Sequence, residues 1–383
     1  MKKRWTTEPL ESVCRELTDG SHFSPPLAAE GVPYVTVRDI EDERIDFDNC
    51  KRISPTDYQV LLKNGCKPNK GDVLFSKDGT VGKVAHVDFE RDFVVLSSLA
   101  IVRPDVGRLD SAFLKYVMLS PSFLDAAVGM KTGAAIRRII LRNLKSIPIP
   151  VPPLAEQQRI VGVLDEAMAG IATARAHAET NLQNARALFE SHLHDVFTQR
   201  GPGWVEKTID KLSTNLDSKR IPITKSDRKP GEYPYYGASG IVDYVHDYIF
   251  DGDALLISED GANLLMRSTP IAFSVSGKYW VNNHAHILKF DHMATQRFVE
   301  FYMESIKLDE FITGAAQPKL NQKALNSIPI PVPAKLSEQQ AIVTQLDALS
   351  AVTQRLAALY ERKLAVLEEL KKSLLHQAFA GEL

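Results

Sequence analysis

The chain has 383 residues, so we expect two or three domains, because a typical domain contains about 100–200 residues. Hydrophobic residues make up 44% of the sequence and charged residues 25%, which excludes intrinsic disorder and a small scaffold held together by disulfides. Its 46 basic and 48 acidic residues give a formal net charge of −2. No global positive field therefore attracts nucleic acid, and a polyanionic partner would need local basic patches or help from another subunit.

The cysteine and hydropathy patterns indicate a cytoplasmic protein. Cys14, Cys50 and Cys66 match no zinc-binding spacing and are odd in number, so we expect reduced thiols in a reducing compartment. The longest nearly apolar stretch, residues 93–102, is about half as long as a membrane span, and no apolar run follows the basic start of the chain. The sequence therefore predicts no secretory signal and no membrane role.

An internal repeat organises the chain. The sequence Ser-Ile-Pro-Ile-Pro-Val-Pro occurs at residues 146–152 and again at residues 327–333, an offset of 181 residues. Shorter motifs recur at offsets of 181 or 182 residues: Gly-Asp at 71–72 and 252–253, Thr-Gly-Ala-Ala at 132–135 and 313–316, and Glu-Gln-Gln at 156–158 and 338–340. We therefore expect two copies of one unit, each a compact region followed by a long helix.

The two copies differ in their N-terminal parts, which we call their fronts. The segment from Trp5 to Gly71 spans 66 residues, whereas the segment from Trp204 to Gly252 spans 48. The spacing from Gly-Asp to Thr-Gly-Ala-Ala is the same in both copies. A constant frame with a variable front is expected of two related modules that read different targets.

In chain order, short runs of β-branched and aromatic residues bounded by turn signals predict the strands of each compact region. They lie at residues 32–37, 72–75 and 94–102 in the first copy and at residues 233–236, 254–257 and 286–290 in the second. An amphipathic helix is predicted near residues 111–119 and near residues 295–306, so each region should be a mixed α+β domain. The alternating prolines of the repeat exclude helix and central strand and predict a stiff, extended spacer.

A long helix should follow each spacer, beginning near Leu154 and near Leu336. Apolar residues then recur at alternating three- and four-residue steps, which indicates a heptad seam. The seam residues are Leu164, Met168, Ile171, Leu182 and Phe189 in the first helix and Leu346, Leu349, Leu356, Leu370 and Leu374 in the second. Helices of about 43 residues would be about 65 Å long and could not bury these stripes alone. We expect them to pack as an antiparallel pair, with surplus apolar width left for another protein.

These patterns predict four parts. The compact regions cover residues 1–150 and 201–331, and the long helices cover residues 151–200 and 332–383. The expected fold class is α+β, with two mixed α/β domains separated by two long helices that pack as an antiparallel coiled coil. An internal pseudo-two-fold repeat would relate the two halves.

No catalytic or cofactor motif stands out. The sequence contains no Walker A loop, no Gly-x-Gly-x-x-Gly after a strand, no Asn/Asp-Pro-Pro-Tyr/Phe motif and no convincing nuclease cluster. His284-x-His286 could be a metal pair, but it lies in an alternating strand without a third ligand at a suitable spacing. His192-x-His194 lies on a helix, where residues i and i+2 face apart. We expect no catalytic residue, no cofactor and no metal.

Basic and amide side chains gather near the repeated Gly-rich turns. Five basic residues and no acid lie between Lys131 and Lys145, and the equivalent part of the second copy contains Gln317, Lys319 and Asn321. A charge run is usually a solvated face. Here, however, small residues would let the backbone approach DNA closely, and arginine, glutamine and asparagine pair bidentately with guanine and adenine edges.

Two further turns could contribute to DNA binding. The turn after the strand at 72–75 could place Lys77, Thr80 and Lys83 near a phosphate or a base, although a strand flanked by turns explains that motif more simply. The run Tyr-Tyr-Gly-Ala-Ser-Gly at 235–240 supplies Tyr236 and Ser239, with a structural tyrosine corner as the alternative. The complete set of candidate DNA-binding residues is Arg38, Lys77, Thr80, Lys83, Arg137 and Arg138 in the first module and Tyr236, Ser239, Gln317, Lys319 and Asn321 in the second.

With these motifs the whole chain resembles the DNA-specificity subunit of type I restriction-modification systems. The resemblance rests on the doubled proline repeat with Glu-Gln-Gln and a long helix, on residues 234–244 and 259–263, and on the ending Phe-Ala-Gly-Glu-Leu at 379–383. It implies two target-recognition domains that each read one half of a split DNA sequence. It also implies that the helices dock modification subunits, two of them, which carry an adenine-N6 methyltransferase, and that the assembly recruits a restriction subunit with ATP-dependent endonuclease activity.

We therefore expect a non-catalytic subunit that binds double-stranded DNA sequence-specifically and scaffolds methyltransferase and restriction subunits. An alternative from another class is a coiled-coil interaction scaffold with two ligand-binding domains and no role on DNA. A mobility shift at several salt concentrations would separate the two, because phosphate contacts make DNA affinity fall steeply with salt. A nuclease with an unrecognised site is disfavoured by the missing motifs.

Overall fold

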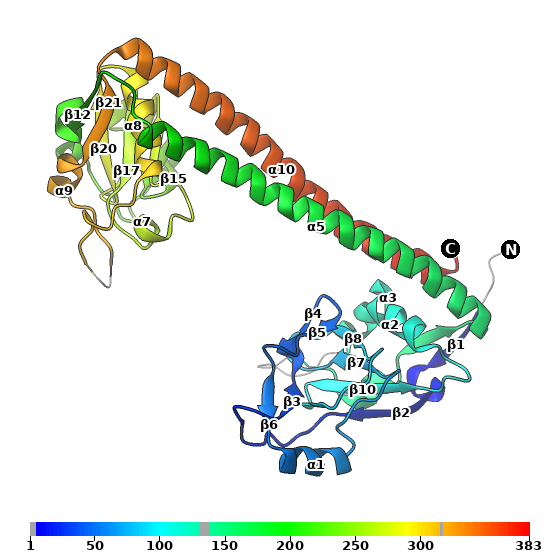
Figure 1. Cartoon of the computed structure of the whole chain (residues 1–383). Helices are drawn as coiled ribbons and strands as arrows, with labels where there is room; N and C mark the ends of the chain where they lie inside the picture. The colour runs from blue at the N-terminus through cyan, green and yellow to red at the C-terminus, as the bar shows by residue number, and fades with distance from the viewer. Residues whose placement is uncertain (1–4, 131–137, 315–316) are drawn as a thin grey trace. The chain divides into compact units, whose positions relative to one another are not determined.

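The computed structural model describes residues 5–130, 138–314 and 317–383, which form two compact units (Figure 1). Unit 1 comprises Met1–Ala178 and Arg362–Leu383, and unit 2 comprises Glu179–Glu361. The long helices α5 (Leu154–Thr198) and α10 (Leu336–Ala380) each contribute one part to each unit, and both begin at the predicted residue. Among the described residues, no helix is long and apolar enough to cross a membrane.

Unit 1 is built on a four-stranded antiparallel sheet in the order β2-β10-β7-β8. These strands are Cys14–Asp19 (β2), Leu99–Pro104 (β10), Val73–Ser76 (β7) and Val84–His86 (β8). The longer front of this unit adds a three-stranded sheet and a hairpin: Lys51–Ile53 (β6), Val32–Val35 (β3), Val94–Val95 (β9), Ile40–Glu41 (β4) and Arg44–Ile45 (β5). The single strand predicted at 94–102 is wrong, because a turn in which the Leu99 amide donates to the Leu96 carbonyl divides it into β9 and β10.

Three of the α-helices of unit 1 begin at a side chain that caps them: Ser54, Asp110 and Ser120. These helices are Pro55–Lys63 (α1), Ser111–Leu119 (α2), Pro121–Gly129 (α3) and Leu141–Lys145 (α4), with 3₁₀ turns at Leu10–Val13 (η1) and Val37–Asp39 (η2). Asp110 accepts a hydrogen bond from the Phe113 amide at 2.9 Å and thereby starts α2 at the predicted residue. Helices α2 and α3 bury Phe113 and Phe123 against the sheet, where Phe123 meets Phe75 edge to face.

Unit 2 repeats this plan with a shorter front. Its four-stranded antiparallel sheet has the order β13-β20-β17-β18, made of Ser213–Asn215, Ala285–Phe290, Ala254–Ser258 and Ala272–Val275. A second sheet has the order β15-β14-β19-β16, made of Gly240–Val245, Pro230–Gly237, Lys278–Val281 and Phe250–Asp251. The helical segments are Ile209–Leu212 (α6), Asp217–Lys219 (η3), Asn263–Met266 (α7), Met293–Ser305 (α8) and Gln322–Ser327 (α9). The duplicated α+β fold expected from the repeat is confirmed.

The proline repeat forms a strand in each unit and is more than a spacer. In unit 1, β11 (Pro148–Val151) pairs antiparallel with β1 (Thr6–Pro9), and in unit 2, β21 (Pro329–Pro333) pairs with β12 (Trp204–Thr208). Both sheets have two strands, so the prolines can turn their missing donors away from the one ladder that each strand makes.

The repeated Glu-Gln-Gln motif fastens each proline strand to the helix that follows it. Gln157 is fully buried, donates to the Pro152 and Arg108 carbonyls at 2.7 and 2.9 Å, and accepts from the Asp110 amide at 2.7 Å. Gln339 donates to the Pro333 carbonyl at 2.8 Å in the same way. The motif is therefore structural.

Within each unit, the parts of α5 and α10 run antiparallel. In unit 1, Arg159 donates to the Leu383 carbonyl at 2.9 Å, and Arg175, further along α5, lies 3.6 Å from Glu368, further back in α10. In unit 2, Arg186 pairs with Glu361 at 2.8 Å. The predicted seam residues that are buried or half-buried are Leu164, Met168, Ile171, Leu182, Phe189, Leu346, Leu349, Leu356 and Leu374.

The prediction that Leu370 lies in the seam is wrong. Its side chain is 44% exposed, whereas Leu364, Leu367 and Lys371 are half-buried. At 3.6 residues per turn, position 371 returns to the face of Leu364, while position 370 is turned away by about 100°. The apolar pattern alone could not distinguish these two steps.

The three cysteines are free. Cys50 and Cys66 are buried, and burial raises the pKa of the Cys14 thiol to about 12. All three thiols therefore behave as apolar packing groups rather than as nucleophiles or metal ligands.

Candidate nucleic-acid interface

In unit 2, residues 317–321 run beside the end of strand β17. The Leu320 amide donates to the Glu259 carbonyl at 2.8 Å, and the Gly261 amide donates to the Pro318 carbonyl at 3.0 Å. Lys319 and Thr313 exchange both backbone hydrogen bonds, at 2.8 and 2.9 Å. We call residues 317–321 the unit 2 reading segment.

The side chains of the unit 2 reading segment have different roles. Gln317 and Lys319 are exposed, and Lys319 Nζ lies 3.1 Å from Glu259 Oε1. Asn321 instead caps helix α9, because its Oδ1 accepts from the Ala324 amide at 3.0 Å. Gln317 and Lys319 are thus available to a ligand, whereas Asn321 has a structural partner.

The tyrosine turn of unit 2 is partly buried. Tyr236 packs against Phe273 and Tyr279 with ring centroids 5.9 Å apart in both cases, and burial raises the pKa of Tyr236. Its neighbour Tyr235 fixes the backbone, since its hydroxyl lies 3.2 Å from the Ile223 amide and 3.3 Å from the Ile223 carbonyl. Ser239, at the tip, is exposed. The alternative interpretation of this run as a structural tyrosine corner therefore applies to Tyr235.

In unit 1, the candidate residues come from three segments that the fold brings together. Arg138 is exposed and forms an antiparallel bridge with Asp78, while the Ile139 amide donates to the Lys77 carbonyl at 2.9 Å. Lys83 donates to the Val37 and Ile40 carbonyls at 3.3 and 2.6 Å, so it ties the turn at 77–83 to the turn that carries Arg38. Arg38 and Thr80 are exposed. Arg137 lies outside the described residues.

The expectation that Lys77 stands at an exposed turn tip is wrong. This side chain is 6% exposed, and its Nζ lies 3.5 Å from Asp19 Oδ1 and 3.3 Å from Asp78 Oδ2. Lys77 follows the buried strand β7 directly, and its ion pairs with Asp19 and Asp78 hold the side chain inside the unit.

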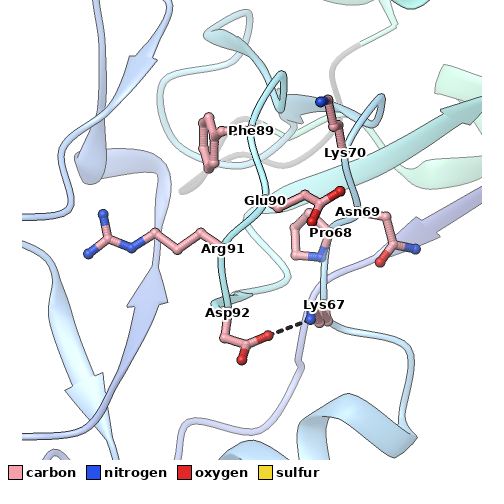
Figure 2. A pocket seen from close by; sticks show the side chains of 8 residues that line it. All are labelled: Lys67, Pro68, Asn69, Lys70, Phe89, Glu90, Arg91 and Asp92. Atoms are coloured by element: carbon pink, nitrogen blue, oxygen red, sulfur yellow. Dashed lines mark hydrogen bonds and ion pairs between the residues drawn. The ribbon is translucent and has the colours of Figure 1, made fainter.

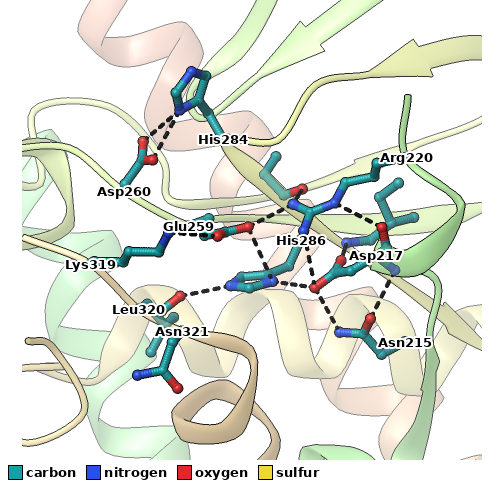
Figure 3. Close-up of polar contacts among 12 residues, drawn as sticks. Asn215, Asp217, Arg220, Glu259, Asp260, His284, His286, Lys319, Leu320 and Asn321 are labelled. Carbon is teal, nitrogen blue, oxygen red and sulfur yellow. Dashed lines mark hydrogen bonds and ion pairs between the residues drawn. The ribbon is translucent and has the colours of Figure 1, made fainter. Parts of the chain in front are cut away.

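A buried polar network lies beneath the unit 2 reading segment (Figure 3). His286 is 1% exposed, with Nε2 2.7 Å from the Leu320 carbonyl and Nδ1 2.6 Å from Asp217 Oδ2. Arg220 Nη1 lies 2.6 Å from Glu259 Oε2. Burial alone would raise the pKa of Asp217 and Glu259, but the hydrogen bond from His286 to Asp217 and that from Arg220 to Glu259 hold both pKa values below their ordinary range.

The acids of this network are neutralised by side chains of the protein itself. Asp217, Glu259 and His286 have ligand atoms within 4.8 Å of one another, which is the geometry of a possible metal site. However, Arg220 and Lys319 form ion pairs with Glu259, and both ring nitrogens of His286 make hydrogen bonds. A metal would have to displace these cations, so the residues fit an ion-pair network better than a metal site.

Asp217 and Arg220 escaped the sequence analysis. They lie in the variable front of unit 2, where no motif marks them, and His286 was considered only as half of a metal pair. A signal did exist, because Glu259-Asp260 follows a buried strand and an acidic pair there requires partners.

A polar hollow lies in unit 1, apart from the segments that carry the candidate residues (Figure 2). It is lined by Lys67, Pro68, Asn69, Lys70, Phe89, Glu90, Arg91 and Asp92. Asp92 accepts from Lys67 at 2.5 Å and from the Tyr58 hydroxyl at 2.9 Å, and Arg91 stacks 4.0 Å above the ring of Phe47. Among the residues that line this hollow, Lys67 and Asp92 pair with each other, and the set forms no catalytic constellation.

Fold and site together define a duplicated binding protein whose modules present different side chains from equivalent backbone positions. The chain matches the family model of the type I restriction modification DNA specificity domain twice, over residues 4–179 and 202–368. It belongs to this family, which confirms the resemblance found in the sequence. Membership also confirms the expectation that the chain is a non-catalytic specificity subunit rather than an enzyme, and that it recognises a DNA target.

Relatives agree with this membership. The chain is 22% identical to a putative type I restriction enzyme MjaX specificity subunit from Methanocaldococcus jannaschii, over 99% of this chain and 93% of the relative. It is 22% identical to the EcoKI specificity subunit of Escherichia coli K12, over 87% of this chain and 76% of the relative. A putative specificity subunit of Haemophilus influenzae is 39% identical, but that match spans 38% of this chain and 37% of the relative.

Solved structures share the fold. A chain from a study of complex assembly and conformational transition of the type I R-M system matches with a TM-score of 0.76 at 17% identity, covering 100% of this chain and 99% of that one. The HsdS subunit from Thermoanaerobacter tengcongensis matches with a TM-score of 0.55 at 18% identity, covering 99% and 97%.

Proposed function

We propose that this chain reads a bipartite DNA sequence, one half with each unit, and directs modification and restriction subunits to it. The observation that carries the proposal is the equivalent placement of Arg138 in unit 1 and Lys319 in unit 2. Each is exposed, and each forms an isolated bridge with an aspartate two residues beyond the end of a central strand. Each is followed by a residue whose amide bonds to the carbonyl just after that strand. Equal frames with different side chains suit two modules that read different half-sites.

The reading residues in this proposal are exposed side chains on these segments. Arginine, glutamine and lysine contact base edges or phosphates, and hydroxyl groups contact either. Those that remain candidates for direct contact are Arg38, Thr80 and Arg138 in the first module and Ser239, Gln317 and Lys319 in the second. Arg137, which lies outside the described residues, remains a candidate from the sequence alone. Lys77, Lys83, Tyr236 and Asn321 would position these residues, because each packs into the unit or bonds to its backbone.

We assign the recognition domains to residues 1–150 and 201–331 and the docking helices to residues 151–200 and 332–383. Helix α10 keeps apolar side chains exposed: Val352 (49%) and Leu359 (58%) in unit 2, and Val366 (57%) and Leu370 (44%) in unit 1. Such side chains on a helix suit a partner protein. Because both units carry this feature, we propose two modification subunits per chain, a restriction subunit recruited by that assembly, and action on DNA in the cytoplasm.

The test combines the purified chain with its modification subunit. Alone, the chain should neither methylate nor cut DNA, and the mixture should methylate adenine within a bipartite sequence. DNA affinity in a mobility-shift assay should fall steeply between about 50 and 200 mM salt, because binding releases counterions from phosphates. Methylation or cleavage by the isolated chain, or the absence of sequence-specific binding by the mixture, would contradict the proposal.

A further inference from the structure

His286 is held between two hydrogen-bond acceptors. The Leu320 carbonyl, 2.7 Å from Nε2, can only accept. Asp217, 2.6 Å from Nδ1, also receives the Ile287 amide at 2.9 Å and the Asn215 side-chain amide at 3.1 Å, so its carboxylate acts as an ionised acceptor. Both ring nitrogens must therefore donate, and the buried ring is an imidazolium (Figure 3).

Each element packed against this ring contributes a charged group. The turn η3 and its C-cap supply Asp217 and Arg220, the end of β17 supplies Glu259, and the unit 2 reading segment supplies Lys319. Glu259 Oε2 lies 3.8 Å from His286 Nδ1 and binds Arg220 as well. When the ring is protonated, the carboxylates of Asp217 and Glu259 face three cations, His286, Arg220 and Lys319. The site tolerates the buried charge of the ring only because both carboxylates stay ionised.

We propose that doubly protonated His286 is a positioning residue for the second half-site, fixing the Leu320 carbonyl and thereby the side chains of Gln317 and Lys319. The inference rests on the proposed function. Without this donor the Leu320 carbonyl loses its partner inside unit 2. Recognition by unit 2 should therefore weaken when the imidazole is removed.

Unit 1 supplies the internal control. Asp19, on β2, lies opposite Ala100 on β10, the place that corresponds to His286 opposite Asp217 in unit 2. No imidazole can occupy that place, because the residue there is Ala100. Unit 1 does carry His22, 3.3 Å from Asp19, but its side chain is 74% exposed. Recognition of the first half-site should therefore change little when His286 is replaced.

The first experiment uses the full chain with its modification subunit and its methylated motif as probe. Affinities of the unaltered chain and of His286→Leu are measured for the cognate duplex, for a duplex altered in the first half-site and for one altered in the second. Discrimination at the second half-site should fall about tenfold in His286→Leu, which corresponds to the loss of one base contact. Equal losses at the two half-sites would overturn the inference, and no discrimination at either half-site by the unaltered chain would instead overturn the proposed function.

Two variants separate positioning from folding. His286→Gln can still donate to the Leu320 carbonyl, so it should restore most of the second half-site discrimination that His286→Leu loses. His284→Gln is the matched control, because the His284 ring bonds to the Asp260 side chain at 2.9 Å and not to the reading segment, so its discrimination should stay that of the unaltered chain. A loss in His286→Gln as large as that in His286→Leu, with first half-site discrimination intact, would refute the role of His286.

Discussion

The two units support equivalent segments with opposite buried charges. The Ile139 amide bonds to the Lys77 carbonyl in unit 1, and the Leu320 amide bonds to the Glu259 carbonyl in unit 2, at 2.9 and 2.8 Å. Lys77 faces the acids Asp19 and Asp78, whereas Glu259 faces the cations Arg220 and Lys319. Both units have therefore kept the same backbone hydrogen bonds, which residues of any type can make. The charged side chains around these bonds have diverged.

The Gly-Asp motif shows the same divergence within identical sequence. Asp72 is 1% exposed, accepts from Arg103 Nε and Nη2 at 3.0 and 2.9 Å, and also accepts from the Asn69 amide at 2.7 Å. Asp253, its counterpart in unit 2, is exposed. A shared motif therefore does not imply a shared energetic role.

The largest effect is expected at Asp72. Asp72→Ala would remove the acceptor of Arg103 Nε and Nη2 and of the Asn69 amide, while Arg103 keeps Glu16, and should destabilise unit 1 by about 3 kcal/mol. Asp253→Ala, the matched control, should cost less than about 0.5 kcal/mol because the side chain is exposed. Hydrogen exchange under increasing urea, resolved by peptide, would report the two units separately. Similar losses from both substitutions would contradict the contrast between the motifs.

A smaller difference is expected between the two anchoring glutamines. Gln157→Ala removes three hydrogen bonds to backbone groups and should cost about 2 kcal/mol. Gln339→Ala removes two bonds, one to the Pro333 carbonyl and one from the Thr295 hydroxyl, so about 1 kcal/mol is expected. The same exchange experiment measures both, and a larger loss from Gln339→Ala would reverse the ranking.

Side chains that read DNA should act on one half-site each. Arg138→Ala should cost about 1–3 kcal/mol on the cognate site and relax one position of the first half-site, and Gln317→Ala should do so in the second. Methylome sequencing of cells that carry each variant would reveal the relaxed position. A change in the half-site read by the other unit would break the modular assignment.

The smallest expected effect is that of low pH on the stability of unit 2. Since the pKa values of Asp217 and Glu259 are lowered in the folded state, these carboxylates stabilise unit 2 above the ordinary carboxyl range, and that stabilisation is lost as pH falls through their lowered pKa values. Glu259→Gln should therefore lower the urea midpoint of unit 2 at neutral pH and make it less sensitive to acid. An unchanged acid sensitivity would show that Glu259 does not contribute through its charge.

Much of the frame could be predicted from the sequence because it depends on local patterns. Proline spacing, helix starts at Leu154 and Leu336, and the helix at 111–119 follow from backbone chemistry and capping. The repeat also located the unit 2 reading segment and the equivalent residues of unit 1. Leu370 was misplaced because steps of three and four residues both continue a heptad, and only packing against α5 selects between them.

The site was less predictable because its partners are distant in the sequence. Asp217 and His286 are separated by 69 residues, and nothing in the pattern of either shows that strands β13 and β20 bring them together. Lys77 was taken for an exposed residue because a lysine beside Asp-Gly usually marks a turn. Its burial depends on Asp19, a residue in another strand of the sheet.

The central claim is that each unit reads its own half of a split target, and the methylated sequence of a chimaera tests it most directly. Replacing residues 201–331 with the corresponding region of a related specificity subunit, and sequencing the methylated DNA, should change the second half of the motif and leave the first half intact. A motif that changes in both halves, or that is continuous rather than split, would contradict the account.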